Sequence, residues 1–251
     1  MATIILNGVE TDTNPLSATD ENDKLTVSGG LNGYEAELLA GNDLVEIDQA
    51  GEKSAAATFR GGEDDDVLIV DNSAYKGISS DITLIGGLGN DSIHAGAGDV
   101  KGTDPGKIKF TGKINGNAGD DQIKVVRADG STVQGGEGDD IIAIGSATKL
   151  NGAGSRAKST VDNSSVNGGQ DDDLISILAA ADLEKSTING GKGDDTLAIS
   201  GSLTGDPGLG DTASSNNFAS TSVANTGGGD DKIRIAEGAS LVNTLINGNA
   251  D

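Results

Sequence analysis

Aspartate residues recur in this sequence at the end of a short, glycine-rich motif. Residues 135–143 read Gly-Gly-Glu-Gly-Asp-Asp-Ile-Ile-Ala, and residues 190–198 read Gly-Gly-Lys-Gly-Asp-Asp-Thr-Leu-Ala. The last aspartates of all copies, complete or degenerate, are Asp23, Asp43, Asp66, Asp91, Asp121, Asp140, Asp173, Asp195 and Asp231. Carboxylates in this setting can bind a hard cation, act as a general acid and base, or close a solvated turn.

The interval between these aspartates varies, which indicates a repeat with a constant corner and loops of different length. The shortest interval, 19 residues, separates Asp121 from Asp140, and the longest, 36 residues, separates Asp195 from Asp231. Solenoid proteins have this organisation, because each coil packs mainly on its neighbours.

Both flanks of the motif alternate between apolar and polar residues, which predicts β-strands with one buried face. After the aspartate come apolar pairs such as Ile123 and Val125, and an apolar residue such as Val133 stands two positions ahead of the first glycine. One coil is therefore predicted as a strand, a Gly/Asp corner, a second strand and a variable loop. The expected fold class is all-β: a parallel β-solenoid of about nine coils, with one corner per coil and variable loops on the other edge.

Parallel stacking at ~4.8 Å per coil would line up the carboxylates of successive corners, where like charges repel. A divalent cation between corners removes this repulsion. Calcium fits best, because it accepts six to eight oxygens in flexible geometry, backbone carbonyls included, and because softer metals prefer His or Cys. The predicted ligands are Asp64, Asp66, Asn90, Asp91, Asp120, Asp121, Asp139, Asp140, Asp171, Asp173, Asp194, Asp195, Asp230 and Asp231.

The motif resembles the calcium-binding nonapeptide of the repeats-in-toxin (RTX), or haemolysin-type, family, Gly-Gly-x-Gly-x-Asp-x-U-x with U apolar. Residues 86–94, 135–143 and 190–198 match it at every fixed position, and the resemblance covers about residues 38–236. It implies a right-handed parallel β-roll or β-helix with Ca²⁺ between the corners. The last aspartate of each motif, such as Asp140 or Asp195, carries over as a side-chain ligand.

This chain departs from the family pattern in having one nonapeptide per coil instead of two. We therefore expect several Ca²⁺ ions in a single row on one edge, and insertions on the other, the longest at roughly 200–222. Residues 1–45 are predicted to form an N-terminal cap with degenerate coils. Residues 46–251 are predicted to form the calcium-binding solenoid, which continues beyond 251 or is completed by another subunit.

Composition excludes several classes of protein. The 251 residues contain no Cys, no Trp and one His, carry a net charge of −23, and are 2% aromatic. Without Cys there is no disulfide framework and no thiolate metal site. The strong negative charge argues against binding to nucleic acid, and no apolar run reaches the ~18 residues of a membrane span. No cleavable signal peptide is expected, and some bacterial export routes need none.

The favoured function is a calcium-binding structural protein outside a bacterial cell: a component of a surface layer, a filament or an adhesin that self-associates and can bind a glycan or cell-surface polysaccharide. A phage virion appendage with the same solenoid is the first alternative, and a polysaccharide-modifying enzyme is the second. We predict no enzyme and no catalytic residue. The single histidine, His94, is expected at an outward strand position as a solvated residue.

Overall fold

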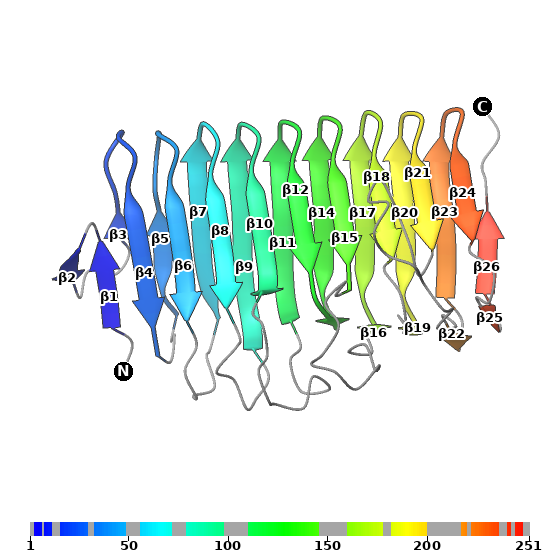
Figure 1. Cartoon of the computed structure of the whole chain (residues 1–251), viewed down its shortest axis with the longest axis horizontal. Coiled ribbons are helices and arrows are strands. Elements are labelled where there is room, and N and C mark those ends of the chain that lie inside the picture. The colour runs from blue at the N-terminus through cyan, green and yellow to red at the C-terminus, as the bar shows by residue number, and fades with distance from the viewer. Residues whose placement is uncertain are drawn as a thin grey trace, which may run out of the picture.

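A computed structural model of the chain describes residues 3–6, 8–11, 16–29, 33–48, 56–71, 79–97, 110–145, 160–177, 182–199, 217–219, 222–235, 240–241 and 244–247. Every regular element in these ranges is a β-strand (Figure 1). None of the described segments is a helix long and apolar enough to cross a membrane. The strands form two long sheets that lie against each other, which agrees with the expected all-β parallel architecture.

Sheet A contains the strands that follow the Gly/Asp corners. Its 11 strands lie in the spatial order β2 (Val9–Thr11), β1 (Thr3–Leu6), β4 (Lys24–Ser28), β6 (Leu44–Asp48), β8 (Val67–Asp71), β10 (Ser92–Ala97), β12 (Gln122–Val125), β15 (Ile141–Ile144), β18 (Leu174–Ile177), β21 (Thr196–Ile199) and β24 (Lys232–Ile235). From β4 to β24 all neighbours are parallel. Strand β1 instead pairs antiparallel with both β2 and β4, so the N-terminal end of this sheet is formed by a different kind of pairing.

Sheet B contains the strands that lead into the corners. Its long face consists of β3 (Leu16–Ser17), β5 (Glu35–Glu37), β7 (Ala57–Glu63), β9 (Ser79–Leu88), β11 (Phe110–Ala118), β14 (Thr132–Glu137), β17 (Ser165–Gln170), β20 (Thr187–Lys192), β23 (Ser222–Gly228) and β26 (Thr244–Asn247). All these neighbours are parallel, and equivalent positions of successive motifs lie side by side. The pairing of β9 with β11 shifts register between Phe110 and Gly112, ahead of the motif.

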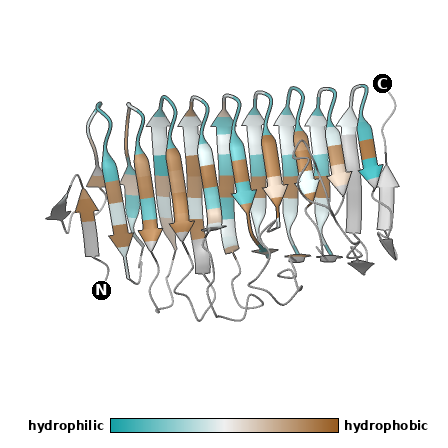
Figure 2. Cartoon of the chain, viewed as in Figure 1, coloured by the Kyte–Doolittle hydropathy of each residue, from teal (hydrophilic) through white to brown (hydrophobic). Residues whose placement is uncertain are grey.

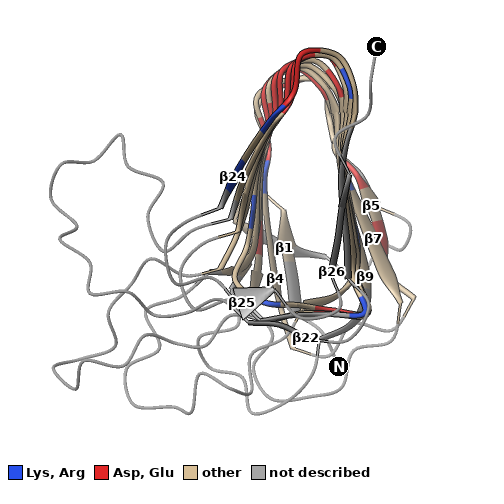
Figure 3. Ribbon diagram, turned by 90° about the vertical axis from the view of Figure 1, so that its right-hand side faces the viewer, with Lys and Arg blue, Asp and Glu red and all other residues tan. Residues whose placement is uncertain are grey.

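A third row of short strands lies at the edge opposite the Gly/Asp corners (Figure 3). It joins sheet B through Phe110, which pairs with Ala128. The row contains β13 (Ala128–Asp129), β16 (Thr160–Asp162), β19 (Asp182–Glu184), β22 (Asn217–Ala219) and β25 (Ser240–Leu241). This corrects the expectation that this edge carries only variable loops: strands of two or three residues are too short to show an alternating pattern in the sequence. Of the insertion expected at 200–222, residues 200–216 and 220–221 lie outside the described residues.

The apolar core fills the space between the two sheets. In β12, Ile123 and Val125 are at most 1% exposed, whereas Gln122 and Lys124 are exposed, as the alternating pattern predicts. Val133 of β14 is fully buried on the facing sheet. Hydrophilic residues gather at the corners that join the sheets (Figure 2).

Candidate metal centre

Each Gly/Asp corner is a tight turn whose backbone demands glycine at most positions. Between β14 and β15, Gly136 and Gly138 have φ angles of 144° and 113°, in a region that side chains with a Cβ rarely adopt. Two motifs carry aspartate at the fourth position, and there Asp64 and Asp171 adopt left-handed φ angles of 74° and 73°. Asp tolerates this conformation better than most residues.

The last aspartate of each motif turns into the corner and is buried. From Asp23 to Asp195 these side chains are between 1% and 3% exposed. The backbone N–H of each donates a hydrogen bond to the Oδ1 of the equivalent aspartate in the next corner; for Asp91 and Asp121 the N···O distance is 2.8 Å. The same bond joins every consecutive pair from Asp23 to Asp231, at 2.6–3.0 Å, and we call this series the inner aspartate row.

The second oxygen of these buried carboxyl groups has no hydrogen-bond partner. This holds for Oδ2 of Asp43, Asp66, Asp91, Asp121, Asp140, Asp173, Asp195 and Asp231. A buried polar atom without a partner costs free energy, more so when it carries charge. Eight such atoms in one row therefore point to a missing proton or cation.

The orphaned oxygens converge with backbone carbonyl groups of the next coil. A Cβ placed on Gly135 would lie 2.0 Å from Oδ2 of Asp140 and 2.5 Å from the carbonyl oxygen of Gly168. The equivalent position on Gly116 lies 1.8 Å from Oδ2 of Asp121 and 2.6 Å from the Gly135 carbonyl. The first glycine of the motif is thus required because the carboxylate occupies the space that a side chain would need.

Burial raises the pKa of the inner aspartates from Asp43 to Asp195 above the ordinary value of 3.8. The backbone hydrogen bond to each Oδ1 lowers the pKa, but neighbouring carboxylates raise it again. For Asp91, burial is the largest cause, and the charges of Asp121 and Asp66 add to it. The resulting pKa values are about 6 for Asp43, Asp121 and Asp195, about 7 for Asp66 and Asp140, and about 8 for Asp91 and Asp173.

A second row of side chains lies one residue earlier and is exposed to solvent. Its hydrogen bonds run in the opposite direction, because the N–H of the later corner donates to the side chain of the earlier one. Asp120 N–H donates to Asn90 Oδ1 at 2.8 Å, and Asp139 N–H donates to Asp120 Oδ1 at 2.9 Å. The members of this outer row include Asp65, Asn90, Asp120, Asp139, Asp172, Asp194 and Asp230.

The structure therefore divides the predicted ligands into three sets. The buried inner row contains Asp66, Asp91, Asp121, Asp140, Asp173, Asp195 and Asp231, and the exposed outer row contains Asn90, Asp120, Asp139, Asp194 and Asp230. Asp64 and Asp171 stand apart at the left-handed positions, where each Oδ2 accepts a backbone N–H at 3.2 Å, from Gly41 and Gly138 respectively. Figure 3 shows the acidic residues gathered along this corner of the molecule.

The N-terminal end of the inner row is closed by the protein itself. Oδ2 of Asp23 accepts hydrogen bonds from the backbone N–H and the hydroxyl of Thr19, at 2.7 and 2.9 Å. Asp43, by contrast, has an orphaned Oδ2 although its motif lacks the Gly-Gly pair, so sequence reasoning missed it as a candidate ligand. The signal was present: Asp43 is followed by the alternating apolar pair Val45 and Ile47, both buried.

Sequence reasoning also missed a second ladder, at the corner that leads from the third row into sheet B. Ser131 N–H donates to Ser164 Oγ at 3.0 Å, and Ser164 N–H donates to Ser186 Oγ at 3.1 Å. Each hydroxyl also donates to a backbone carbonyl, that of Phe110, Asp162 and Val161 respectively. The sequence signal is an acidic residue two positions ahead of a serine, at 129–131, 162–164 and 184–186. In the structure, the residue between them has a positive φ angle.

His94 lies on the outer face of sheet A, in register with Ile69 of β8 and Lys124 of β12. It is half-buried rather than fully solvated. Burial lowers its pKa below 6.5, and the charge of Lys124 lowers it further.

Within the described residues, no three acidic or histidine side chains converge closely enough to form a metal site by themselves. A cation here would have to be held by carboxylate oxygens of successive corners together with backbone carbonyls. No protein-family model matches the chain, and no match is found among the curated proteins or the solved structures.

Proposed function

We propose that this chain is a calcium-binding, extracellular structural protein of the RTX type, whose solenoid folds and self-associates when Ca²⁺ ions bind in one row between stacked corners. The observation that carries the proposal is the inner aspartate row, with an orphaned, buried Oδ2 in every corner from Asp43 to Asp231. At neutral pH, a cation between corners satisfies these oxygens without the burial of unpaired charge.

Calcium suits the donors that are present. All are oxygens, half of them backbone carbonyls of glycine, and each coil offers one carboxylate oxygen because Oδ1 is engaged by an N–H. Ca²⁺ accepts such mixed oxygen sets with variable geometry, whereas Mg²⁺ requires a stricter octahedron and retains its waters. Right-handed winding and about nine coils remain part of this proposal.

Metal binding would then contribute directly to folding. Without the cation the corners hold stacked carboxylates, and the narrow core between two sheets cannot offset both their repulsion and the ordering of the backbone. A rod that forms only outside the cell, where calcium is abundant, suits a surface layer, a filament or an adhesin.

Equilibrium dialysis against Ca²⁺, with and without excess Mg²⁺, tests the binding step, and light scattering of the same samples tests assembly. We expect several bound ions per chain, retained against Mg²⁺, and scattering that rises with calcium occupancy. Absence of bound calcium at ~1 mM, the affinity range of extracellular modules, would refute the proposal. Calcium binding without increased scattering would refute self-association alone.

A further inference from the structure

The outer face of sheet B carries two straight rows of uncharged polar side chains. Thr132, Ser165 and Thr187 pair across β14, β17 and β20 and form the first row. Gln134, Asn167 and Asn189 pair across the same strands and form the second. We call these six residues the polar lane. Its spacing follows from the sheet: ~4.8 Å between strands and about 7 Å between the rows.

The side chains of the polar lane have hydrogen-bonding capacity to spare. In the amide row, Asn189 Nδ2 donates to Asn167 Oδ1 at 2.7 Å, so these amide groups are joined to each other. The hydroxyl groups of Thr132, Ser165 and Thr187 make no hydrogen bond within the described part of the chain. The lane can therefore offer donors and acceptors at the interval of the coils.

The polar lane is neutral on a protein with a net charge of −23. Between the lane and the aspartate corner lies one further row, Glu137, Gln170 and Lys192, whose charges cancel. Gln170 Nε2 donates to Glu137 Oε1 at 3.1 Å. Over β14, β17 and β20, a ligand on this face thus meets hydroxyl and amide groups without net charge.

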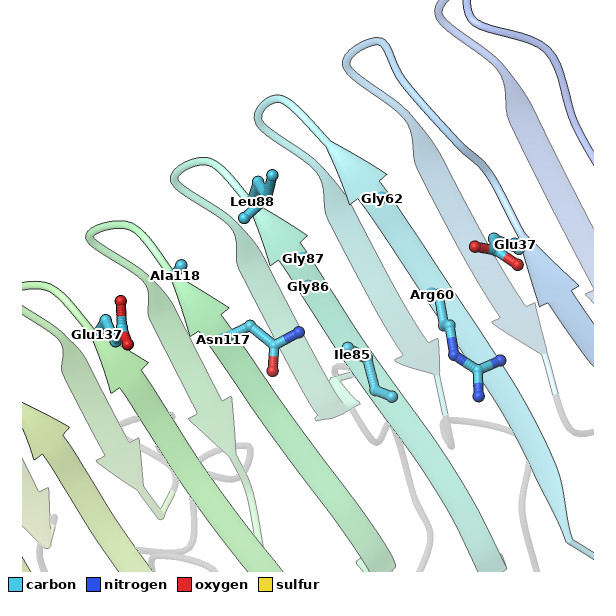
Figure 4. Close-up of a pocket in the computed structure, with 10 residues that line it drawn as sticks. All are labelled: Glu37, Arg60, Gly62, Ile85, Gly86, Gly87, Leu88, Asn117, Ala118 and Glu137. Carbon is cyan, nitrogen blue, oxygen red and sulfur yellow. The ribbon is translucent and has the colours of Figure 1, made fainter.

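Toward the N-terminus the hydroxyl row ends at Lys113, whereas the amide row continues through Asn115 to a groove of about 500 Å³, where the charge of Arg60 is opposed by Glu37 and Glu137 (Figure 4). Arg60 and Ile85 occupy the register of the amide row, and Leu88 occupies the register of Glu137 through Ala118. Leu88 is 56% exposed, one of the few large apolar side chains at the surface of the described residues. The groove thereby adds an apolar patch that suits the C–H face of a sugar ring.

We propose that the polar lane and this groove bind a linear, uncharged polysaccharide, of the extended β-1,4-linked hexose type, which runs along the long axis of the solenoid. Successive sugars of such a chain are turned by about half a revolution, so its repeating unit of two sugars spans about two coils and alternate sugars meet equivalent side chains. Because strand pairing occupies the backbone N–H and C=O groups of sheet B, a ligand can contact this face only through its side chains. This inference goes beyond calcium binding and requires only that the solenoid is folded.

Native gel electrophoresis of the full chain in gels containing hydroxyethylcellulose, with saturating Ca²⁺, tests the inference. We expect the polysaccharide to retard the wild-type chain. The combined substitutions Thr132→Val, Ser165→Ala and Thr187→Val, which remove three hydroxyl groups, should weaken the apparent affinity about tenfold. Gln134→Leu, at an exposed position that does not threaten folding, should weaken it severalfold.

Thr196→Val is the matched control, since Thr196 projects from the outer face of sheet A in the same coil as Thr187. It should migrate as the wild type does. Retardation that is absent in the wild type, unchanged in the lane variants, or stronger with carboxymethylcellulose would overturn the inference. Circular dichroism of every sample separates this failure from a failure of calcium-dependent folding.

Discussion

The aspartate corner and the serine corner, which contains Ser131, Ser164 and Ser186, both join successive coils through side-chain oxygens. They differ in what the rest of the side chain does. At both, a backbone N–H of one coil donates to a side-chain oxygen of the next, as Asp140 N–H does to Asp173 and Ser131 N–H does to Ser164. The serine hydroxyl also donates its own hydrogen to a backbone carbonyl oxygen. The second carboxylate oxygen of the aspartate has no hydrogen-bond partner. One corner is therefore complete in the protein alone, whereas the other requires a proton or a cation.

The largest expected difference between the corners concerns their glycines. Gly135→Ala would place a Cβ 2.0 Å from Asp140 Oδ2, so we expect it to lower the free energy of unfolding by about 3 kcal/mol. Gly130→Ala, beside Ser131, meets no atom within 4 Å and should cost only about 1 kcal/mol for its φ of 67°. Urea denaturation in calcium measures both variants. Equal losses would contradict the account of the aspartate corner.

Substituting the ladder residue at each of the two corners should change the free energy of unfolding in opposite directions when no metal is present. Asp140→Asn keeps the acceptor for Asp121 N–H and replaces the orphaned oxygen with a donor beside the Gly168 carbonyl. We expect it to raise stability in chelator by 1–2 kcal/mol and to lose the part of the calcium stabilisation that comes from the ion held by Asp140.

The serine variant provides the comparison. Ser164→Ala should lower stability by about 1–2 kcal/mol equally in chelator and in calcium, because it removes an acceptor and a donor. Thermal unfolding of both variants with and without calcium measures this pattern. An Asp140→Asn variant that is as calcium-dependent as the wild type would show that this carboxylate binds no cation.

The stability of the metal-free protein should depend on pH through the aspartate corner and not through the serine corner. Burial raises the folded-state pKa values of the seven inner aspartates from Asp43 to Asp195 to about 6–8, above the unfolded value of 3.8. The folded state then binds more protons than the unfolded state between these values, so stability in chelator falls as pH rises from about 4 to about 8. Urea midpoints at pH 5 and pH 8 measure this effect. Calcium should restore stability at pH 8; a metal-free protein that is more stable at pH 8 than at pH 5 would contradict the burial of these carboxyls.

The smallest expected effect concerns the number of ions bound at the N-terminal end of the inner aspartate row. Asp43→Asn should remove about one bound Ca²⁺ per chain, because its Oδ2 is orphaned. Asp23→Asn should leave the number of bound ions unchanged, since Thr19 already satisfies that oxygen. Equilibrium dialysis measures both. Loss of an ion from the Asp23 variant would show that the row extends further than the hydrogen bonds indicate.

The sequence predicted the aspartate corner well, because the corner depends on residue types that a repeat makes visible. Burial of Ile123 followed from the alternation of apolar and polar residues after the motif. The serine corner was missed because its strands are two or three residues long and only Ser131, Ser164 and Ser186 mark it. A search for acidic-x-Ser ahead of each Gly-Gly pair would have found it.

The division of the acidic residues into a buried and an exposed row could not be predicted from residue types. Asp120 and Asp121 are adjacent and chemically identical, yet one lies outside the corner and the other is 1% exposed. Which of them turns inward is decided by the backbone of the turn and by the direction of hydrogen bonds to neighbouring coils. Those bonds exist only once coils are stacked.

Far-ultraviolet circular dichroism of the chelator-treated protein at pH 8, during a calcium titration with magnesium as control, shows directly whether cation binding by the inner aspartate row folds the protein. With the inner row ionised and no cation, we expect a folded fraction well below that of the calcium-bound protein at the start. We expect a cooperative gain of β-signal near ~1 mM Ca²⁺ and none at equal Mg²⁺. A spectrum that is already β-rich in chelator and unchanged by calcium would contradict it.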